Sequence, residues 1–292
     1  HPRFSCSRRH TRCCSWSRGL GDVYKRQGLI GGIAPGRYAD LVMIPDVQTI
    51  EAQMVISNGK VIAQKGTLLT APRPHTFSKQ SRNSVKLPRD MEASDFIISA
   101  ETAALHVNVR IINMVTDLVT AELAIHWPVT DGQINPDVAQ DVIKVAAIDR
   151  THNPGKIYVG LVKGFGLKSG AMACSAAWDT SDIIVAGTND ADIAVAVNRI
   201  RTLQGGAVVC ENGKIAAELP LPIFGIMSDL PIETIVQRLQ EIKNAVSVLG
   251  VPFPDPLLTL ITLTGAAIPY LRICEEGLVN LKDGKTIELI VS

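Results

Sequence analysis

Short apolar runs of strand length recur along the chain between glycine and proline punctuation. Residues 39–44 form such a run between Pro-Gly and Pro-Asp pairs, which is typical of a buried strand. Residues 52–66 hold two runs around an Asn-Gly pair, the dipeptide favoured in two-residue hairpins. The pattern predicts hairpin turns at Asn58-Gly59, Asn212-Gly213 and Asp283-Gly284.

Longer periodic segments predict helices between further strands. Residues 191–203 follow the capping residues 188–190 and end at two glycines, and a longer apolar stripe runs from Ser228 to Gly250. Asn135-Pro136-Asp137 is a third helix-start signal, with an apolar face over 138–147. The further strands are predicted at 107–115, 156–162, 182–187 and in the tail after 271. Because strands and helices alternate, the predicted fold class is α+β or α/β.

Shifts in composition divide the chain into four segments. Residues 28–67 are rich in short strands and predict a small β domain, while 96–292 predict a mixed α/β domain. Residues 68–95 contain three prolines and several basic residues without periodicity, which favours a linker. Residues 1–27 show no apolar period.

The first 27 residues carry seven Lys and Arg but one acid, so the remaining chain has 22 basic and 27 acidic residues, a net charge of −5. A transit peptide or a basic nucleic-acid arm would fit that composition in part. The run SRGLGDVYKRQ (17–27) instead resembles the in-frame translation of a transposase adapter used for sequencing libraries. We therefore expect 1–27 to be non-native and disordered, the natural protein to be cut at its start, and the acidic body not to bind nucleic acid.

Apolar runs and cysteines indicate the compartment. No apolar run reaches the roughly 18 residues that span a bilayer, so we expect no membrane association. Outside the first segment three cysteines remain, at 174, 210 and 274, without a CxxC pair. Scattered thiols are typical of a reducing compartment, and the sequence predicts a cytoplasmic protein.

Candidate chemistry is concentrated in two short polar connections between apolar runs. Residues 179–182, read DTSD, hold two carboxylates three positions apart that could serve as an acid–base pair, or they form a β-turn. Residues 149–156 hold a comparable polar group, or they form a solvated loop. The candidate site residues are Asp179, Thr180, Ser181, Asp182, Asp149, Arg150 and His152. The histidines outside 1–27 show no metal-binding spacing, so no metal ligand is assigned in this chain.

Longer motifs carry a family resemblance. Residues 31–44, read GGIAPGRYADLVMI, resemble the segment that returns the chain to the small β-sandwich of amidohydrolases after their metal-binding barrel. Residues 160–200, 219–231 and 268–281 resemble the C-terminal domain of the bacterial adenine deaminase family. The resemblance implies hydrolysis of adenine to hypoxanthine and ammonia, a homo-oligomer, and Mn²⁺ or Fe²⁺ in a TIM barrel that is missing here.

Two departures from the family pattern affect the candidate residues. Where the family typically reads A-H-D-S-H-N, residues 177–182 read AWDTSD, so Trp178 and Ser181 replace both histidines. The family's E-R-H run becomes Asp149-Arg150-Thr151, with His152 displaced by one position. Either the chain is a divergent paralogue with altered activity, or the residues at 177–182 were never essential to the family's activity.

We expect the fragment by itself to be inactive, because the metal ligands would lie before residue 28. One alternative is a non-catalytic oligomerisation or interaction module, which the lost histidines favour. The other alternative is an amidohydrolase part that acts on another purine or on a cyclic amide.

Overall fold

The computed structural model describes residues 28–71, 75–100 and 102–291, so the expectations about residues 1–27 lie outside it. The chain divides into two compact units between Thr76 and Phe77. Both contain β-sheets, the second adds helices, and no sheet in the described residues closes into a barrel. The structure is therefore a mixed α/β fold, as predicted. Within the described part, no helix is both long and apolar enough to cross a membrane.

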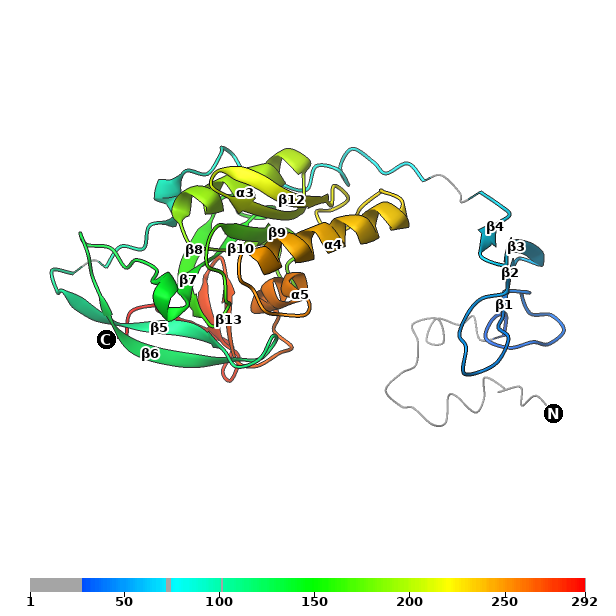
Figure 1. Ribbon diagram of the computed structural model, residues 1–292, viewed down its shortest axis with the longest axis horizontal. Helices are drawn as coiled ribbons and strands as arrows, with labels where there is room; N and C mark the ends of the chain where they lie inside the picture. The colour runs from blue at the N-terminus through cyan, green and yellow to red at the C-terminus, as the bar shows by residue number, and fades with distance from the viewer. Residues whose placement is uncertain (1–27, 72–74, 101, 292) are drawn as a thin grey trace. The chain divides into compact units, whose positions relative to one another are not determined.

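The first unit is a four-stranded antiparallel sheet in the order β1-β2-β3-β4 (Figure 1). Its strands are β1 (Leu41–Met43), β2 (Met54–Ser57), β3 (Lys60–Gln64) and β4 (Thr67–Leu68). Asn58 and Gly59 both have positive φ, 49° and 74°, which confirms the predicted hairpin turn. The expected burial of β1 is wrong: Val42 and Met43 are 63% and 52% exposed, because no second layer of described residues in this unit covers the sheet.

The second unit is built on an eight-stranded sheet in the order β12-β11-β9-β10-β7-β8-β5-β6. All neighbours are antiparallel except β5 and β8. The strands are β5 (His106–Met114), β6 (Thr120–Pro128), β7 (Val142–Asp149), β8 (Ile157–Lys163), β9 (Ala171–Cys174), β10 (Asp182–Gly187), β11 (Gly206–Glu211) and β12 (Lys214–Pro220). Asn212-Gly213 forms the predicted turn between β11 and β12.

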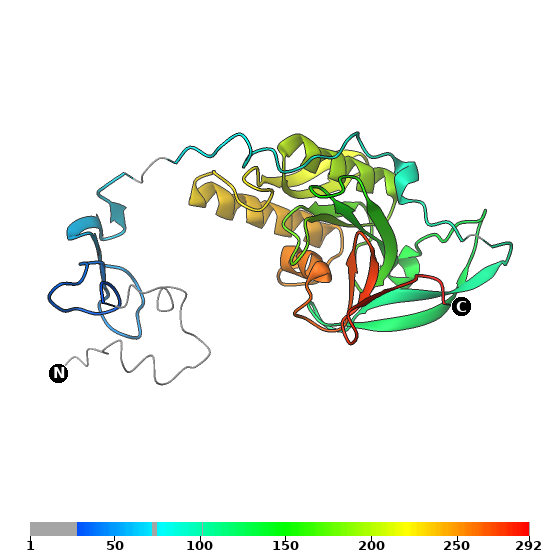
Figure 2. The same ribbon diagram turned by 180° about the vertical axis from the view of Figure 1, so that it is seen from behind.

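Helices cover both faces of this sheet. One core cluster joins α3 (Asp190–Leu203) and the short η1 (Ala93–Phe96) to one face. The other cluster joins α4 (Ile232–Val248) and α5 (Pro256–Ile261), which runs on into η3 (Thr262–Thr264), to the opposite face. A small sheet of β13 (Leu271–Cys274), β14 (Gly277–Asn280) and β15 (Lys285–Ile287) packs on that second face, as Figure 2 shows from behind.

The helix predicted from Asn135 is wrong. Asp137 caps only the three-residue η2 (Val138–Gln140), and Asp141 then turns the chain at φ 53° into β7. Along β7, Val145 and Ala147 face one core cluster while Ala146 and Ile148 face the other. A strand buried on both faces has a continuous apolar run without visible alternation, which sequence periodicity does not distinguish from a helix.

The predicted linker, 68–95, is divided by the structure. Its later part belongs to the second unit, where Val85, Leu87 and Met91 are buried beside α3. Backbone amides there donate hydrogen bonds to side chains instead of to a neighbouring strand. The Met91 amide, for example, donates to Asn198 Oδ1 at 2.8 Å. The lack of periodicity therefore reflects an extended segment packed on a helix.

The cap of α3 supports one prediction. Asn189 Oδ1 accepts a hydrogen bond from the Asp192 amide at 2.8 Å, and its Nδ2 donates to Asp192 Oδ2 at 2.8 Å. We expect Asn189→Ala to lower the free energy of unfolding in urea by about 1 kcal/mol. Asn189→Ser keeps an oxygen that can accept the amide bond, so it should lose less. Equal losses in the two variants would contradict a capping role.

Candidate functional site

The two polar connections singled out in the sequence lie side by side in the fold. Strands β7 and β10 pair antiparallel, with Asp149 directly opposite Asp182. The loop 150–156 leaves the end of β7, and the strip 178–181 leads into the start of β10. Antiparallel pairing thus joins groups that are about thirty residues apart in the chain.

Asp149 shapes the loop that follows it. The residue is only 2% exposed, and its carboxylate accepts hydrogen bonds from the backbone amides of Thr151, His152 and Asn153 at 2.8, 3.1 and 2.5 Å. Burial by itself raises the pKa of this carboxyl, but these amides and the Ser181 hydroxyl outweigh it and hold the pKa below its ordinary value. Asp149 is therefore a carboxylate that fixes the course of residues 151–153.

Ser181 joins the Asp149 carboxylate to the exposed imidazole of His152 through hydrogen bonds. Its Oγ lies 3.0 Å from Asp149 Oδ1 and 3.0 Å from His152 Nδ1. The Thr151 hydroxyl is also 3.0 Å from His152 Nδ1. The serine stands between the acid and the histidine, whereas a nucleophilic triad needs the histidine in the middle. The arrangement suits proton transfer along hydrogen bonds better than attack by Ser181.

Arg150 points into the protein interior and not toward the loop surface. It is 5% exposed, and its Nη1 donates to the Ser84 carbonyl at 2.8 Å. A Cβ on Gly225 would lie 2.8 Å from the guanidinium, so that glycine permits close packing on it. Burial lowers the pKa of Arg150, and Nε has no hydrogen-bond partner among the described residues. Arg150 thus joins the segment before η1 to the sheet.

The strip 178–182 separates into two parts. Asp179, in a left-handed conformation at φ 60°, accepts the Ala266 amide on Oδ2 at 2.7 Å. Thr180 Oγ1 lies 3.4 Å from the Asp182 amide, which donates to it. The Trp178 carbonyl accepts from the Thr264 hydroxyl at 2.7 Å. Residues 178–180 therefore form a bend that Trp178 and Asp179 hold to the segment after α5, while Ser181 alone of the strip bonds to His152.

Asp182 is the most unusual group of the site. It is fully buried, and neither carboxylate oxygen has a hydrogen-bond partner in the described part of the chain. Burial, and next the charge of Glu275, raise the pKa of Asp182 to about 7. An unpartnered buried carboxylate is costly when ionised, so the fold favours its protonated form.

Sequence reasoning missed Glu275, which lies in the turn between β13 and β14. The signal was the pair of acids in the run 274–277, CEEG, between two apolar strands. Its neighbour Glu276 forms an ion pair with Lys156 of the loop 150–156. The small sheet thus supplies acidic groups to both polar connections.

The described residues contain no group of three or more His, Cys, Asp and Glu side chains that could hold a metal ion. Asp182 and Glu275 are two acids without a third ligand, and the bonds of Asp149 are taken by backbone amides. The residues at this site therefore do not fit a resident metal.

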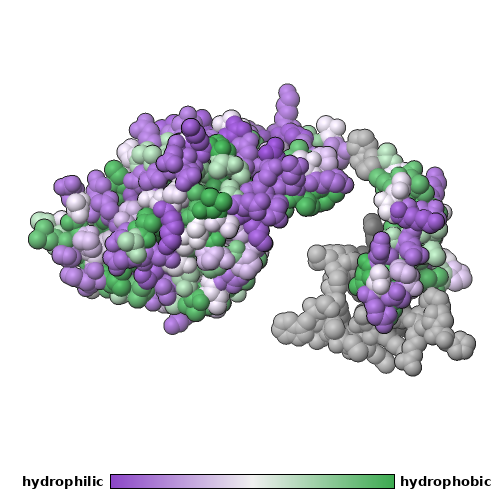
Figure 3. All heavy atoms as spheres, in the orientation of Figure 1, coloured by the Kyte–Doolittle hydropathy of each residue, from purple (hydrophilic) through white to green (hydrophobic). Residues whose placement is uncertain are grey.

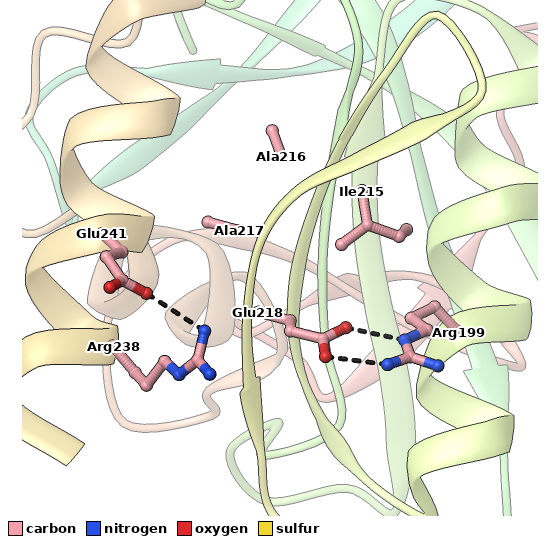
Figure 4. A pocket seen from close by; sticks show the side chains of 7 residues that line it. All are labelled: Arg199, Ile215, Ala216, Ala217, Glu218, Arg238 and Glu241. Atoms are coloured by element: carbon pink, nitrogen blue, oxygen red, sulfur yellow. Dashed lines mark hydrogen bonds and ion pairs between the residues drawn. The ribbon is translucent and has the colours of Figure 1, made fainter. Parts of the chain in front are cut away.

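A separate hollow of about 420 Å³ lies between α3, β12 and α4 (Figure 4). Arg199 holds Glu218 through two bonds of 2.6 and 2.8 Å, and Arg238 pairs with Glu241 at 3.2 Å. β12 is the edge strand, three positions from β10 in the sheet. Since both arginines are already paired with acids, we assign this hollow no function.

The comparisons with known proteins agree on one family. The family model of the adenine deaminase C-terminal domain matches residues 117–285. The adenine deaminases of Moorella thermoacetica, Brucella abortus and Kosmotoga olearia are 36%, 38% and 36% identical over 262, 252 and 263 residues. The alignments cover 89%, 86% and 90% of this chain but 44%, 42% and 45% of those proteins, so the chain spans less than half the length of these relatives. The chain belongs to the adenine deaminase C-terminal domain family.

Proposed function

We propose that the chain works as the C-terminal part of a hydrolase that converts adenine and water to hypoxanthine and ammonia. The observation that carries this proposal is the family match over 117–285, together with relatives named adenine deaminase along most of the chain. Those relatives are more than twice as long as the matched part. We therefore propose that this chain releases no ammonia from adenine by itself.

The residues of this chain that suit the reaction are those of the hydrogen-bonded series Asp149–Ser181–His152. Hydrolytic deamination needs a proton on the departing nitrogen. His152 is exposed, with Nδ1 held by Ser181 and Thr151, while Nε2 has no hydrogen bond to a described residue. In the proposed role, Nε2 carries the proton and Asp149 steadies the ring through Ser181.

The Mn²⁺ or Fe²⁺ implied by the resemblance has no ligand set among the described residues. We assign the binding of this metal to a part of the enzyme other than these residues. The contribution of this chain is limited to positioning and proton transfer.

We further place the protein in the cytoplasm. The support is that Cys174 and Cys210 are buried free thiols and Cys274 is a half-buried one, with no disulfide among the three. Unpaired cysteines of this kind are typical of reducing compartments. Fractionation of cells that express the full natural gene would test the assignment.

A chimera tests the proposed activity. Residues 28–292 would replace the matched C-terminal part of the Moorella thermoacetica enzyme, and ammonia release from adenine would be measured with added Mn²⁺. We expect the chimera to deaminate adenine and the 292-residue chain to give only the blank rate. His152→Ala should lower kcat of the chimera by about a hundredfold or more, the lower range for loss of a general acid or base.

The matched control is His106→Ala, because His106 is also exposed but stacks on His126 of the β5–β6 pair, away from Asp149. It should leave kcat unchanged. A folded chimera without activity would overturn the proposed function, and ammonia release by the chain itself would overturn its inactivity.

A second candidate function is a non-catalytic interaction module. The observation that favours it is the pair Trp178 and Ser181, which stand where the resemblance places histidines, with Trp178 38% exposed. In this case His152→Ala would leave kcat of the chimera unchanged. The double change Trp178→His with Ser181→His would then also have no effect, whereas a divergent catalytic strip should gain activity from it.

A further inference from the structure

Two histidines lie together on the β5–β6 pair, at one edge of the eight-stranded sheet. The imidazole rings of His106 and His126 are stacked, with centroids 4.8 Å apart and planes 12° from parallel. Both residues are exposed. Figure 1 shows the two strands as a long ribbon at one side of the second unit, and Figure 3 shows hydrophilic side chains mixed with small apolar areas at that end. The two rings are therefore held next to each other in solvent by regular secondary structure.

Antiparallel pairing brings these rings together although about twenty residues separate them along the chain. Asn108 is directly opposite His126, and His106 is two positions before Asn108 on the same face of β5. The Asn108 carbonyl accepts the Val291 amide at 2.8 Å on the side of β5 away from β6. Asn108 and His126 thus form a non-hydrogen-bonded pair, the type in which opposite side chains are closest. Spacing along the sequence does not reveal a pair formed in this way.

Asn108 sets the chemical state of one ring. His126 Nδ1 lies 3.3 Å from Asn108 Oδ1. Because a carbonyl oxygen only accepts, Nδ1 carries the hydrogen of this bond, and the neutral ring then has its lone pair on Nε2. Histidines that bind metal ions are usually held in this way, through the nitrogen that does not face the ion. Among the described residues, none forms a hydrogen bond with the His106 ring, so that ring can turn toward the same ion.

The charges beside the two rings do not oppose a cation. Apart from the histidines, the titratable side chains of β5 and β6 on this face are Arg110 and Glu122. They form an ion pair with Nε and Oε1 2.6 Å apart, and the Arg110 guanidinium also donates to the Glu288 carbonyl. The one positive charge near the rings is therefore already neutralised by an acid.

We propose that His106 and His126 bind one divalent ion of the zinc, nickel and copper group through one ring nitrogen each, with Asn108 holding the His126 ring. Imidazole favours these ions, whereas Mg²⁺ and Ca²⁺ favour oxygen ligands. Zinc–nitrogen bonds of about 2.0–2.1 Å place two nitrogens of a tetrahedral ion roughly 3.4 Å apart, so the His106 ring must turn toward the ion. Water completes the coordination. The proposal does not depend on the enzymatic function, since it rests only on these three side chains.

Nuclear magnetic resonance of the imidazole groups in the full 292-residue chain tests the proposal, with Zn²⁺ as the probe. Residues 1–27 also contain histidines and cysteines, which bind such ions, so separate ring signals are needed in place of total binding. We expect Zn²⁺ to shift the signals of both rings of the pair with one dissociation constant. His126→Ala should weaken binding at His106 by about a hundredfold, because one of two linked ligands is lost. Asn108→Ala should weaken binding by about tenfold, and Mg²⁺ should shift neither ring.

His152→Ala is the matched control, because it removes an exposed imidazole that has no second imidazole among its described partners. Zinc binding at the pair should be the same in this variant as in the wild type. The proposal is overturned if Zn²⁺ shifts neither ring of the pair. It is also overturned if His126→Ala leaves the affinity at His106 unchanged, as expected for rings that bind ions separately. Unchanged affinity in Asn108→Ala would contradict the part assigned to Asn108.

The metal of the deamination assay does not load this pair. Mn²⁺ is the weakest binder in the first-row series of divalent ions, and two imidazoles without a carboxylate suit it poorly. We therefore expect His106→Ala to remain neutral for kcat of the chimera with Mn²⁺, while it removes the Zn²⁺ shift of the His126 ring.

Discussion

Asp182→Asn is expected to make the protein more stable than the wild type above pH 7 and nearly equal to it at about pH 4. Asp182 is fully buried without a hydrogen-bond partner among the described residues, and its pKa in the folded protein is raised to about 7. The unfolded chain returns this carboxyl to its ordinary pKa near 4. Between these two values the folded state holds a proton that the unfolded state has lost.

The sign of the pH dependence follows from that difference. Because the unfolded state binds fewer protons in this window, the wild type loses stability as the pH rises from about 4 to 7, with a slope approaching about 1.4 kcal/mol per pH unit. The charges of Glu275 and Asp149 both act in this direction. Asparagine does not titrate, so the variant does not lose this part of its stability as the pH rises. We expect the free energies of unfolding of the two proteins to differ by roughly 4 kcal/mol at pH 8.

The measurement is urea unfolding of both proteins at several pH values between 4 and 9. Asp179→Asn is the control, since Asp179 is exposed and its carboxylate accepts the Ala266 amide. Glu275→Gln should make the fall end at a lower pH, because it removes the charge that, after burial, contributes most to the raised pKa of Asp182. Parallel curves for wild type and Asp182→Asn across the whole range would refute a protonated Asp182.

Asp149→Ala is expected to cost about 3 kcal/mol of unfolding free energy at pH 7. The change leaves three backbone amides, of Thr151, His152 and Asn153, without their acceptor, and the Ser181 hydroxyl loses one of its bonds. Asp149→Asn should cost less, because the amide oxygen still accepts some of these bonds. The loop should also exchange its amide hydrogens faster in the alanine variant.

The pH dependence of Asp149 has the opposite sign to that of Asp182. Its pKa is below the ordinary value, so its contribution is complete above pH 4 and is lost as the pH falls through the folded pKa. The gap between wild type and Asp149→Ala should therefore narrow in acid. Asp137→Ala is the comparison: Asp137 lies at the surface, where its carboxylate accepts the backbone amides of Ala139 and Gln140 and the Gln140 side-chain amide, and its loss should cost less. Equal losses for the two variants would contradict a special role of Asp149.

Local turn and cap chemistry was readable in the sequence. The hairpins at Asn58-Gly59 and Asn212-Gly213 and the start of α3 at Asn189 are where the residues predict them. These features depend on residues that are neighbours in the chain, through positive φ or a side-chain bond to an amide three positions on. The predicted start of α4 at Ser228 is wrong. The helix begins at Ile232, which directly follows Pro231.

Features that depend on packing were not readable in this way. β7 looked like a helix because both of its faces are apolar, and the segment around Leu87 looked like a linker because it packs without regular structure. The sequence predicts the two polar strips, but it does not predict that Asp179 and Ser181 bond to different parts of the fold. That division follows from which partner each side chain meets, Ala266 for Asp179 and Asp149 for Ser181.

The sequence by itself determined the mixed α/β class, the family resemblance and the two polar strips, because these depend on residue types and spacings along the chain. Only the tertiary structure decided that the strips lie on paired strands and that Arg150 turns inward. It also decided that Glu275 reaches Asp182 from a hairpin about ninety residues later. The physical reason is that burial and the charge of a distant neighbour set the protonation of a carboxyl, and neither is a property of the local sequence.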